Sequence, residues 1–198
     1  GKDITKVKEY KRNQKIGRVY QNPSMGTCPS MTILENMSLA DNKGRFYGLG
    51  RGTNKARIDY YREQLAQLGL GLEDKLHVKV GSLSGGQRQR VWIAMALCQG
   101  TKTLFLDEPT TYLDIRYQIE ILQLVKKLNQ EFGITIIMVL HDINQAIAYS
   151  DNVIGMKDGK VLVEGDLEEV ITEESIRELY GIELGVTRVD GRKFVLAV

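Results

Sequence analysis

Apolar residues along the 198-residue chain follow two kinds of pattern, and each pattern predicts one kind of secondary structure. Short apolar runs predict strands at residues 16–20, 104–106 and 134–140. The last of these runs is continuous and rich in β-branched residues, which is typical of a parallel strand covered on both faces. Apolar positions three or four residues apart predict helices at residues 33–40, 54–68, 85–98 and 115–131.

Capping and turn residues mark where these elements begin and end. Thr32 and Asp114 precede helical patterns and are predicted to cap them, and Gly133 is predicted to end the longest helix. From about residue 153 the pattern predicts two hairpins that turn at Asp-Gly pairs, with a helix at residues 173–180 between them. The inward face of the predicted helix 115–131 comprises Ile119, Leu122, Val125 and Leu128.

A glycine-rich turn at residues 83–87, Leu-Ser-Gly-Gly-Gln, opens the predicted helix 85–98. The start of a helix offers backbone N–H groups without helical partners and the positive end of the helix dipole. This turn can therefore hold a phosphate group. One stripe of the helix is predicted to face the core, namely Val91, Ile93, Ala94, Leu97 and Cys98.

Two adjacent carboxylates, Asp107 and Glu108, stand at the tip of the predicted strand 104–106, and Pro109 ends that strand. Neighbouring side chains of a strand point to opposite faces, so the two carboxylates can serve different partners. One can hold Mg²⁺ and the other a water molecule. The ordinary alternative for such a pair is a solvated corner.

Composition narrows the class of protein without identifying it. The chain is 42% hydrophobic and 26% charged, and its net charge of +2 at pH 7 indicates no strong field for nucleic acid or membrane. The two cysteines, Cys28 and Cys98, form no metal motif and indicate a reduced, cytoplasmic setting. No apolar run is long enough to span a bilayer, so any membrane role is expected to come through a partner.

The glycine-rich turn and, one helix later, the strand that ends in Asp107 and Glu108 resemble motifs of the ATP-binding-cassette (ABC) transporter ATPases, which have them in the same order. Residues 83–87 match the signature sequence of that family, residues 104–108 look like its Walker B strand, and residues 112–114, Tyr-Leu-Asp, look like its D-loop. The resemblance implies an α/β fold of the P-loop NTPase type, with a mainly parallel sheet and an α-helical subdomain.

Two single residues gain a role only from the resemblance. Gln21 follows the first predicted strand, where the family has its Q-loop glutamine, but taken alone it is an ordinary solvated residue. His141 follows the predicted strand 134–140, where the family has its switch histidine. Without the resemblance, a histidine at a strand end is more often a buried, satisfied group.

The resemblance implies ATP and Mg²⁺ as cofactors and a role for each residue of the chain's own site. Asp107 would hold Mg²⁺ through water, and Glu108 would polarise the attacking water. His141 would contact the γ-phosphate, and Gln21 would touch the metal and act as a hinge.

A second group of residues would act on a partner, because the ATPase domains of the family sandwich ATP head to tail. Ser84, Gly85, Gly86 and Gln87 would reach nucleotide bound on the opposite subunit. Asp114 would couple the two sites across the dimer.

A working member of the family also needs a Walker A loop, Gly-x-x-x-x-Gly-Lys-Ser/Thr, whose N–H groups cradle the phosphates. No such run occurs in these 198 residues. The chain order of the family places the loop well before Gln21, so we expect the N-terminal part of the core to be absent. The chain alone is predicted to be inactive, either as an incomplete product or as a protein that has lost its nucleotide site.

The resemblance also predicts the organisation of the chain and its partners. The expected parts are a remnant of the N-terminal core at residues 1–21, a helical subdomain at 22–81, the ATPase core with signature, Walker B, D-loop and H-loop at 82–165, and a C-terminal helix and hairpin at 166–198. The expected partners are a second ABC ATPase subunit, transmembrane permease subunits and, indirectly, a substrate-binding protein, with no nucleic acid. These partners would place the chain on the cytoplasmic face of the cell membrane.

The two halves of the chain resemble different branches of the family. Up to about Gln89 the sequence resembles ATPases of importers for tryptophan and related small solutes, and from Arg90 onward it resembles those of iron-siderophore and cobalamin importers. A composite chain joined at the shared signature is one interpretation, and independent drift of one ordinary ATPase is the other. The leading hypothesis for function is iron-siderophore import, ahead of small-solute import and of a catalytically dead ABC module. ABC proteins of DNA repair and translation are a further class, but this chain has neither their coiled-coil insertions nor their tandem cassettes.

Overall fold

The computed structural model describes residues 3–13, 15–21, 23–43, 52–53, 55–69 and 71–196. The chain divides into two compact units, Gly1–Val139 and Leu140–Val198, which are described separately below. Among the helices of the described ranges, none combines the length and the apolarity that a bilayer span requires.

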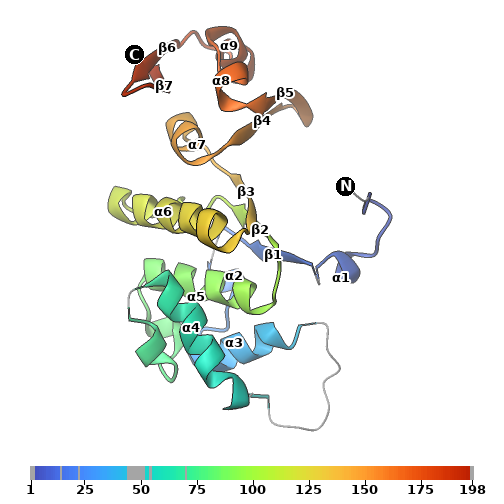
Figure 1. Ribbon diagram of the computed structural model, residues 1–198, viewed down its shortest axis with the longest axis vertical. Coiled ribbons are helices and arrows are strands. Elements are labelled where there is room, and N and C mark those ends of the chain that lie inside the picture. The colour runs from blue at the N-terminus through green and yellow to red at the C-terminus, as the bar shows by residue number, and fades with distance from the viewer. Residues whose placement is uncertain are drawn as a thin grey trace. The chain divides into compact units, whose positions relative to one another are not determined.

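The first unit contains a three-stranded parallel sheet and most of the helices (Figure 1). Its strands are β1 (Ile16–Val19), β2 (Thr103–Asp107) and β3 (Thr135–Val139). Its α-helices are α1 (Glu9–Arg12), α2 (Pro23–Gly26), α3 (Ile33–Asp41), α4 (Ile58–Leu68), α5 (Gly85–Cys98) and α6 (Ile115–Phe132). Short 3₁₀ turns are η1 (Lys55–Arg57), η2 (Glu73–Lys75) and η3 (Val80–Ser82).

The sheet has one face toward the core and one face that is more open. The strands lie in the order β1-β2-β3, and Val19, Leu106 and Met138 are neighbours in the register on the core face. On the opposite face of β3, Ile137 and Val139 are 44% and 50% exposed. The prediction that this strand is covered on both faces is therefore wrong for the described residues. Alternation places Ile136 and Met138 on the face that packs against the core, and the apolar side chains of the other face stay partly open.

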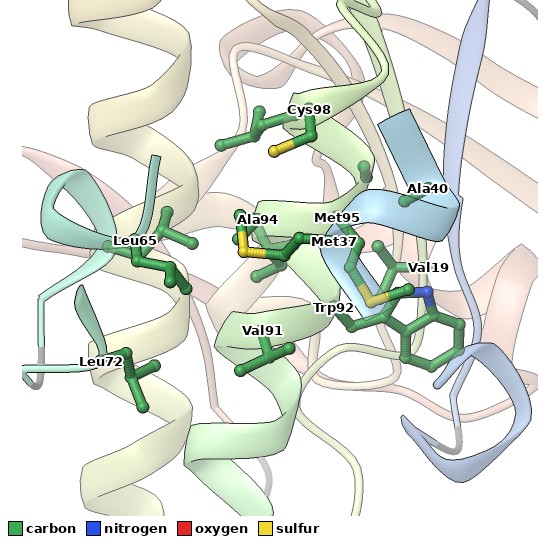
Figure 2. Packing of buried hydrophobic residues seen from close by; sticks show 14 of the residues in the cluster. Val19, Met37, Ala40, Leu65, Leu72, Val91, Trp92, Ala94, Met95 and Cys98 are labelled. Atoms are coloured by element: carbon green, nitrogen blue, oxygen red, sulfur yellow. The ribbon is translucent and has the colours of Figure 1, made fainter. Parts of the chain in front are cut away.

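Helix α5 is the centre of the core of the first unit. The predicted stripe is buried, but Trp92, Met95 and Ala96 on the other sides of the helix are buried too. Figure 2 shows Leu65 and Leu72 on one side of α5, with Val19 and Trp92 on the other. The helix is enclosed on all sides, so the prediction of a single inward stripe was incomplete.

Two glycines allow other elements to pack closely on α5. A Cβ atom at Gly26 would lie 1.9 Å from Cε2 of Trp92, and a Cβ atom at Gly17 would lie 3.2 Å from Cβ of Ala96. Larger side chains at these two positions would push α2 and β1 away from α5.

The predicted helix ends agree well with the structure. Thr32 caps α3 in a reciprocal capping box with Glu35, and the side chain of Asp114 caps α6. Gly133 ends α6 in the left-handed conformation, with φ of 62°. Thr32, Asp114 and Gly133 therefore have the predicted roles.

Two details of the helices differ from the prediction. Helix α4 begins at Ile58 rather than near residue 54, because the η1 turn occupies residues 55–57; Asn54 itself lies outside the described residues. In α6, Ile119 is 42% exposed and Ile121 is buried in its place. The first turns of α6 extend beyond the core, as the 75% exposure of Ile115 also indicates.

The second unit contains α7 (Ile143–Tyr149), α8 (Leu167–Val170) and α9 (Glu173–Tyr180). Its two antiparallel hairpins are β4–β5 (Asn152–Lys157 and Lys160–Asp166) and β6–β7 (Gly185–Val189 and Arg192–Leu196). Its own small core is formed by Ile147, Ile171, Ile176 and Val195. Both predicted hairpins and the predicted helix 173–180 are confirmed.

Candidate functional site

The carboxyl ends of β1 and β2 bring two distant predicted site residues together. Val19 lies beside Leu106 in the register, so Gln21 and Glu108, each two residues further along, meet just beyond the sheet. The side-chain amide of Gln21 donates a hydrogen bond from Nε2 to Oε2 of Glu108. We call Gln21, Asp107, Glu108 and Thr111 the strand-end cluster.

The carboxylate of Glu108 is held from two separate segments of the chain. Besides the amide of Gln21, the hydroxyl of Thr111 donates a hydrogen bond of 3.1 Å to the same Oε2 atom. The backbone of Glu108 is left-handed, with φ of 48°. This conformation costs a non-glycine residue about 1–2 kcal/mol, so the surrounding contacts must hold this turn in place.

Asp107 has surroundings different from those of Glu108. Its side chain is 41% exposed, and its Oδ2 atom lies 3.8 Å from a guanidinium nitrogen of Arg18. Such an exposed pair is weak and easily exchanged for another cation. The two carboxylates therefore have different partners, as strand alternation predicts.

The donor atoms of the cluster fit a magnesium ion that is shared with a phosphate ligand. Mg²⁺ prefers oxygen ligands and usually takes only one or two carboxylates, together with waters and phosphate oxygens. The partly exposed carboxylate of Asp107 and the amide oxygen of Gln21 are suitable donors. Within the described ranges, no group of three or more His, Cys, Asp or Glu residues could hold a metal without such help.

The glycine-rich turn at residues 83–87, called the signature turn below, is organised by its own side chains. Oγ of Ser84 accepts a hydrogen bond of 3.3 Å from the backbone N–H of Gln87, and Oε1 of Gln87 accepts one of 3.1 Å from the backbone N–H of Ser84. This reciprocal capping box fixes the start of α5. Ser84 and Gly85 are exposed, so a ligand can approach the start of the helix.

The start of α6 lies against the signature turn. Gly86 is buried, and a Cβ atom there would lie 3.1 Å from Cδ1 of Tyr117. Oδ1 of Asp114 accepts a hydrogen bond of 3.2 Å from the backbone N–H of Tyr117. Gly86 and Asp114 thus both contact Tyr117.

His141 lies in the second unit, two residues after the end of β3. It is exposed and borders a cavity of about 280 Å³ within that unit, together with apolar residues and Tyr180. Burial raises the pKa of Tyr180, and the nearby carboxylate of Asp142 raises it further. The role of His141 stays a prediction.

The sequence patterns did not single out three residues that support the site. Thr111 contacts Glu108, Tyr117 contacts Gly86, and the buried Arg90 donates a hydrogen bond of 2.9 Å from a guanidinium nitrogen to Oε2 of Glu120. Burial lowers the pKa of Arg90, and the carboxylate of Glu120 opposes that change. Only Thr111 carried a local signal, since a hydroxyl three residues after a carboxylate is within reach of it.

Comparison with protein families gives a clear match. A model of the ABC transporter family matches residues 1–111. The chain is 47% identical over 151 residues to the petrobactin import ATP-binding protein FpuC of Bacillus anthracis, covering 73% of this chain and 56% of FpuC. It is 40% identical over 179 residues to a tyrosine transport ATP-binding protein of Clostridioides difficile, covering 89% of this chain and 71% of that protein.

A third relative bears on the resemblance of the two halves. The ferric enterobactin transport ATP-binding protein FepC of Escherichia coli is 38% identical over 169 residues, covering 85% of this chain and 60% of FepC. Similarity to a siderophore transport protein therefore extends well beyond the second half of the chain. The chain spans little more than half the length of FpuC and FepC.

Solved structures share the fold. A dimeric structure of the ATP-binding cassette MJ0796, bound to ADP and Pi, is 36% identical with a TM-score of 0.65, covering 82% of this chain and 68% of that one. A putative metal-chelate type ABC transporter in an inward-facing conformation gives a TM-score of 0.77 at 23% identity, covering 92% of this chain and 72% of that chain. The predicted α/β fold with a parallel sheet is confirmed.

Proposed function

The chain belongs to the ABC transporter family, and on this premise we propose that it is the ATP-binding and hydrolysing subunit of a bacterial importer of iron-siderophores. The single observation that carries the proposal is the strand-end cluster. It brings Gln21 from one motif onto Glu108 of another, at the carboxyl edge of a parallel sheet. Ligands of open α/β sheets bind at that edge.

The chain's own half-site would act by positioning and by charge. Glu108, held by Gln21 and Thr111, is placed to orient and polarise an attacking water. Asp107 and Gln21 would hold Mg²⁺, which neutralises charge on the phosphates when it is bound. His141 would contact the γ-phosphate.

The signature turn would act on nucleotide bound by a second subunit. Ser84, Gly85, Gly86 and Gln87 offer a hydroxyl, an amide side chain and the start of a helix dipole to a γ-phosphate, and Asp114 would couple the two sites. Phosphoryl transfer depends chiefly on such positioned charges, so this contribution can complete a partner's site without chemistry of its own.

We propose that the 198-residue chain is inactive by itself, because it contains no Gly-x-x-x-x-Gly-Lys-Ser/Thr run to cradle the phosphates. It is proposed to act with a second ATPase subunit, with permease subunits and, through them, with a substrate-binding protein at the cytoplasmic face of the membrane. We also propose that the chain is organised in four parts. They are a remnant of the N-terminal core at residues 1–21, a helical subdomain at 22–81, the ATPase core at 82–165, and a C-terminal helix and hairpin at 166–198.

The test is hydrolysis of Mg-ATP by this chain alone, and then in a mixture with full-length FpuC in which the serine of its own signature is replaced by arginine. Neither protein should turn over ATP alone, and the mixture should. The control replaces Ser84 by Arg in this chain, which should abolish activity in the mixture. ATP hydrolysis by the chain alone would contradict the proposal that it is inactive by itself. No hydrolysis in the mixture would favour a catalytically dead module.

Iron-siderophores are proposed as cargo because FpuC and FepC are named for petrobactin import and ferric enterobactin transport. The tyrosine transport relative supports small-solute import as the second candidate. A composite gene stays a hypothesis. The encoding DNA tests it, since one uninterrupted native gene with close full-length relatives would contradict a join near residue 90.

A further inference from the structure

Two pairs of residues join the first turns of α5 and α6. The first pair is Gly86 and Tyr117, whose ring would lie 3.1 Å from a Cβ atom at residue 86. The second pair lies about one turn further along each helix, where Arg90 donates to Glu120 at 2.9 Å. The two contacts fix how α5 starts relative to α6.

Tyr117 contacts both elements that face a partner in the proposed function. Its ring lies against Gly86 of the signature turn, and its backbone N–H donates to Oδ1 of Asp114. Gly86 is buried there although the neighbouring Ser84 and Gly85 are exposed. The ring of Tyr117 therefore packs against the buried side of the signature turn, at Gly86, and leaves Ser84 and Gly85 open to a ligand.

We propose that Tyr117 is a positioning residue, which fixes the position of the signature turn relative to Asp114. The inference rests on the proposed function, because positioning matters for ATP only if the signature turn completes a partner's site. In this role Tyr117 does not itself touch nucleotide. It acts through Gly86, whose lack of a side chain lets the helix start settle on the ring.

The second pair keeps a change at Tyr117 local. Arg90 is buried, and besides Glu120 it donates a hydrogen bond of 2.5 Å to the backbone oxygen of Leu68 at the end of α4. A buried arginine with two such partners holds α4, α5 and α6 together without help from Tyr117. Removing the ring should therefore loosen the signature turn and leave the rest of α5 in place.

Amide hydrogen exchange tests this directly. In Tyr117→Ala, the backbone amides of Gln87 and Arg88 should exchange about tenfold faster, because local opening of the capping box is easier. The amides of residues 95–98, at the far end of α5, should be unchanged. Tyr117→Phe keeps the ring and should restore the original exchange. Unchanged exchange at Gln87 and Arg88, or equal acceleration along all of α5, would overturn the proposal.

A double substitution tests the contact itself. Gly86→Ala places a Cβ atom against the ring and should lower Tm, whereas Gly85→Ala meets nothing within 4 Å and should not. In Gly86→Ala/Tyr117→Ala the obstruction is absent, so the loss of Tm should be smaller than the sum of the two single losses. Additive losses would contradict a direct contact.

Measuring ATP hydrolysis by the Tyr117 variants distinguishes a failure of this inference from a failure of the proposed function. In the mixture with the FpuC variant, Tyr117→Ala should lower kcat about tenfold through misplacement of the signature turn, with Tyr117→Phe and the exposed control Lys127→Ala close to the original chain. An original chain that fails in the mixture refutes the proposed function, while hydrogen exchange still decides the role of Tyr117. Full activity of Tyr117→Ala in an active mixture would refute the positioning role.

Discussion

The signature turn and the strand-end cluster hold their side chains in different ways. In the signature turn, Ser84 and Gln87 bond each other across three residues. In the strand-end cluster, Gln21 reaches Glu108 across 87 residues of chain. The first arrangement is local, and the second exists only when β1 and β2 are paired.

This difference predicts how each region responds to damage. A capping box depends on the helix start that it caps, so core defects elsewhere should affect it little until the unit unfolds. The strand-end cluster depends on the register of two strands and on the core beneath them, so small shifts there should separate its members. The first three changes below test this contrast and the fourth tests the core behind both regions, in order from the largest expected effect to the smallest.

The largest effect is expected for Leu106→Ala, directly before Asp107. Leu106 is 1% exposed, and its truncation should cost about 2–5 kcal/mol in the free energy of unfolding. Urea denaturation measures the loss, and NMR should show larger shifts at Gln21 and Glu108 than at Ser84 and Gln87. The control is Ile137→Ala on the open face of the sheet, which should cost clearly less. Equal shifts in the two regions would break the contrast.

Ser84→Ala should have the next largest effect, because it removes the hydroxyl that caps α5. The expected loss is about 1 kcal/mol in the free energy of unfolding. Ser84→Thr keeps a capping hydroxyl and should recover most of the loss. NMR signals of Gln21 and Glu108 should stay in place in both variants, and movement of those signals would show that the two regions are not independent.

A smaller effect is expected for the contact between Gln21 and Glu108. A double-mutant cycle with Gln21→Ala and Glu108→Ala should give a coupling of about 0.5–1.5 kcal/mol, the usual net value of a hydrogen bond. Chemical denaturation of the four proteins supplies the values. A coupling near zero would mean that the amide and the carboxylate do not stabilise each other.

The smallest effect concerns alkaline pH and the core behind both regions. Burial raises the pKa of the Cys98 thiol from an ordinary value of 9.0 to about 12. Burial and the hydrogen bond to Asp41 raise the pKa of Tyr61 to about 12. Both groups stay protonated in the fold, so their contribution is complete below pH 9 and is lost as the pH rises toward 12.

Denaturation between pH 8 and 11.5 measures this loss. Stability should fall above about pH 9 in the original chain, following the ordinary pKa of a thiol. The fall should be shallower in Cys98→Ala, since one of the two titrating groups is gone. An identical pH dependence in the two proteins would contradict a buried, neutral thiol at residue 98.

The sequence predicted those features that local chemistry decides. The strands, the caps at Thr32 and Asp114, the end of α6 at Gly133 and the helix 173–180 follow from short patterns, and all agree with the structure. The errors arose where burial depends on distant segments. The exposure of Ile119 and the open face of β3 are examples, because apolar residues stand on both candidate sides there and periodicity cannot decide which side the core will cover.

The same limit applies to the candidate site. Motifs identified Gln21 by itself and Asp107 with Glu108 as a pair, but the contact of Gln21 with Glu108 required the pairing of β1 with β2. Tyr117 had no local signal at all. Its importance depends on the approach of α6 to Gly86, a contact between segments that are separated by a strand and a loop.

The most direct test of the central claim is whether the signature turn of this chain completes a partner's ATP site. Full-length FpuC with its catalytic glutamate replaced by glutamine should retain ATP, and analytical ultracentrifugation of its mixture with this 22.3 kDa chain can detect a joint complex. We expect a one-to-one complex that forms with Mg-ATP, is absent without nucleotide and is lost in Ser84→Arg. Two separately sedimenting proteins in the presence of Mg-ATP, or a complex indifferent to Ser84→Arg, would contradict it.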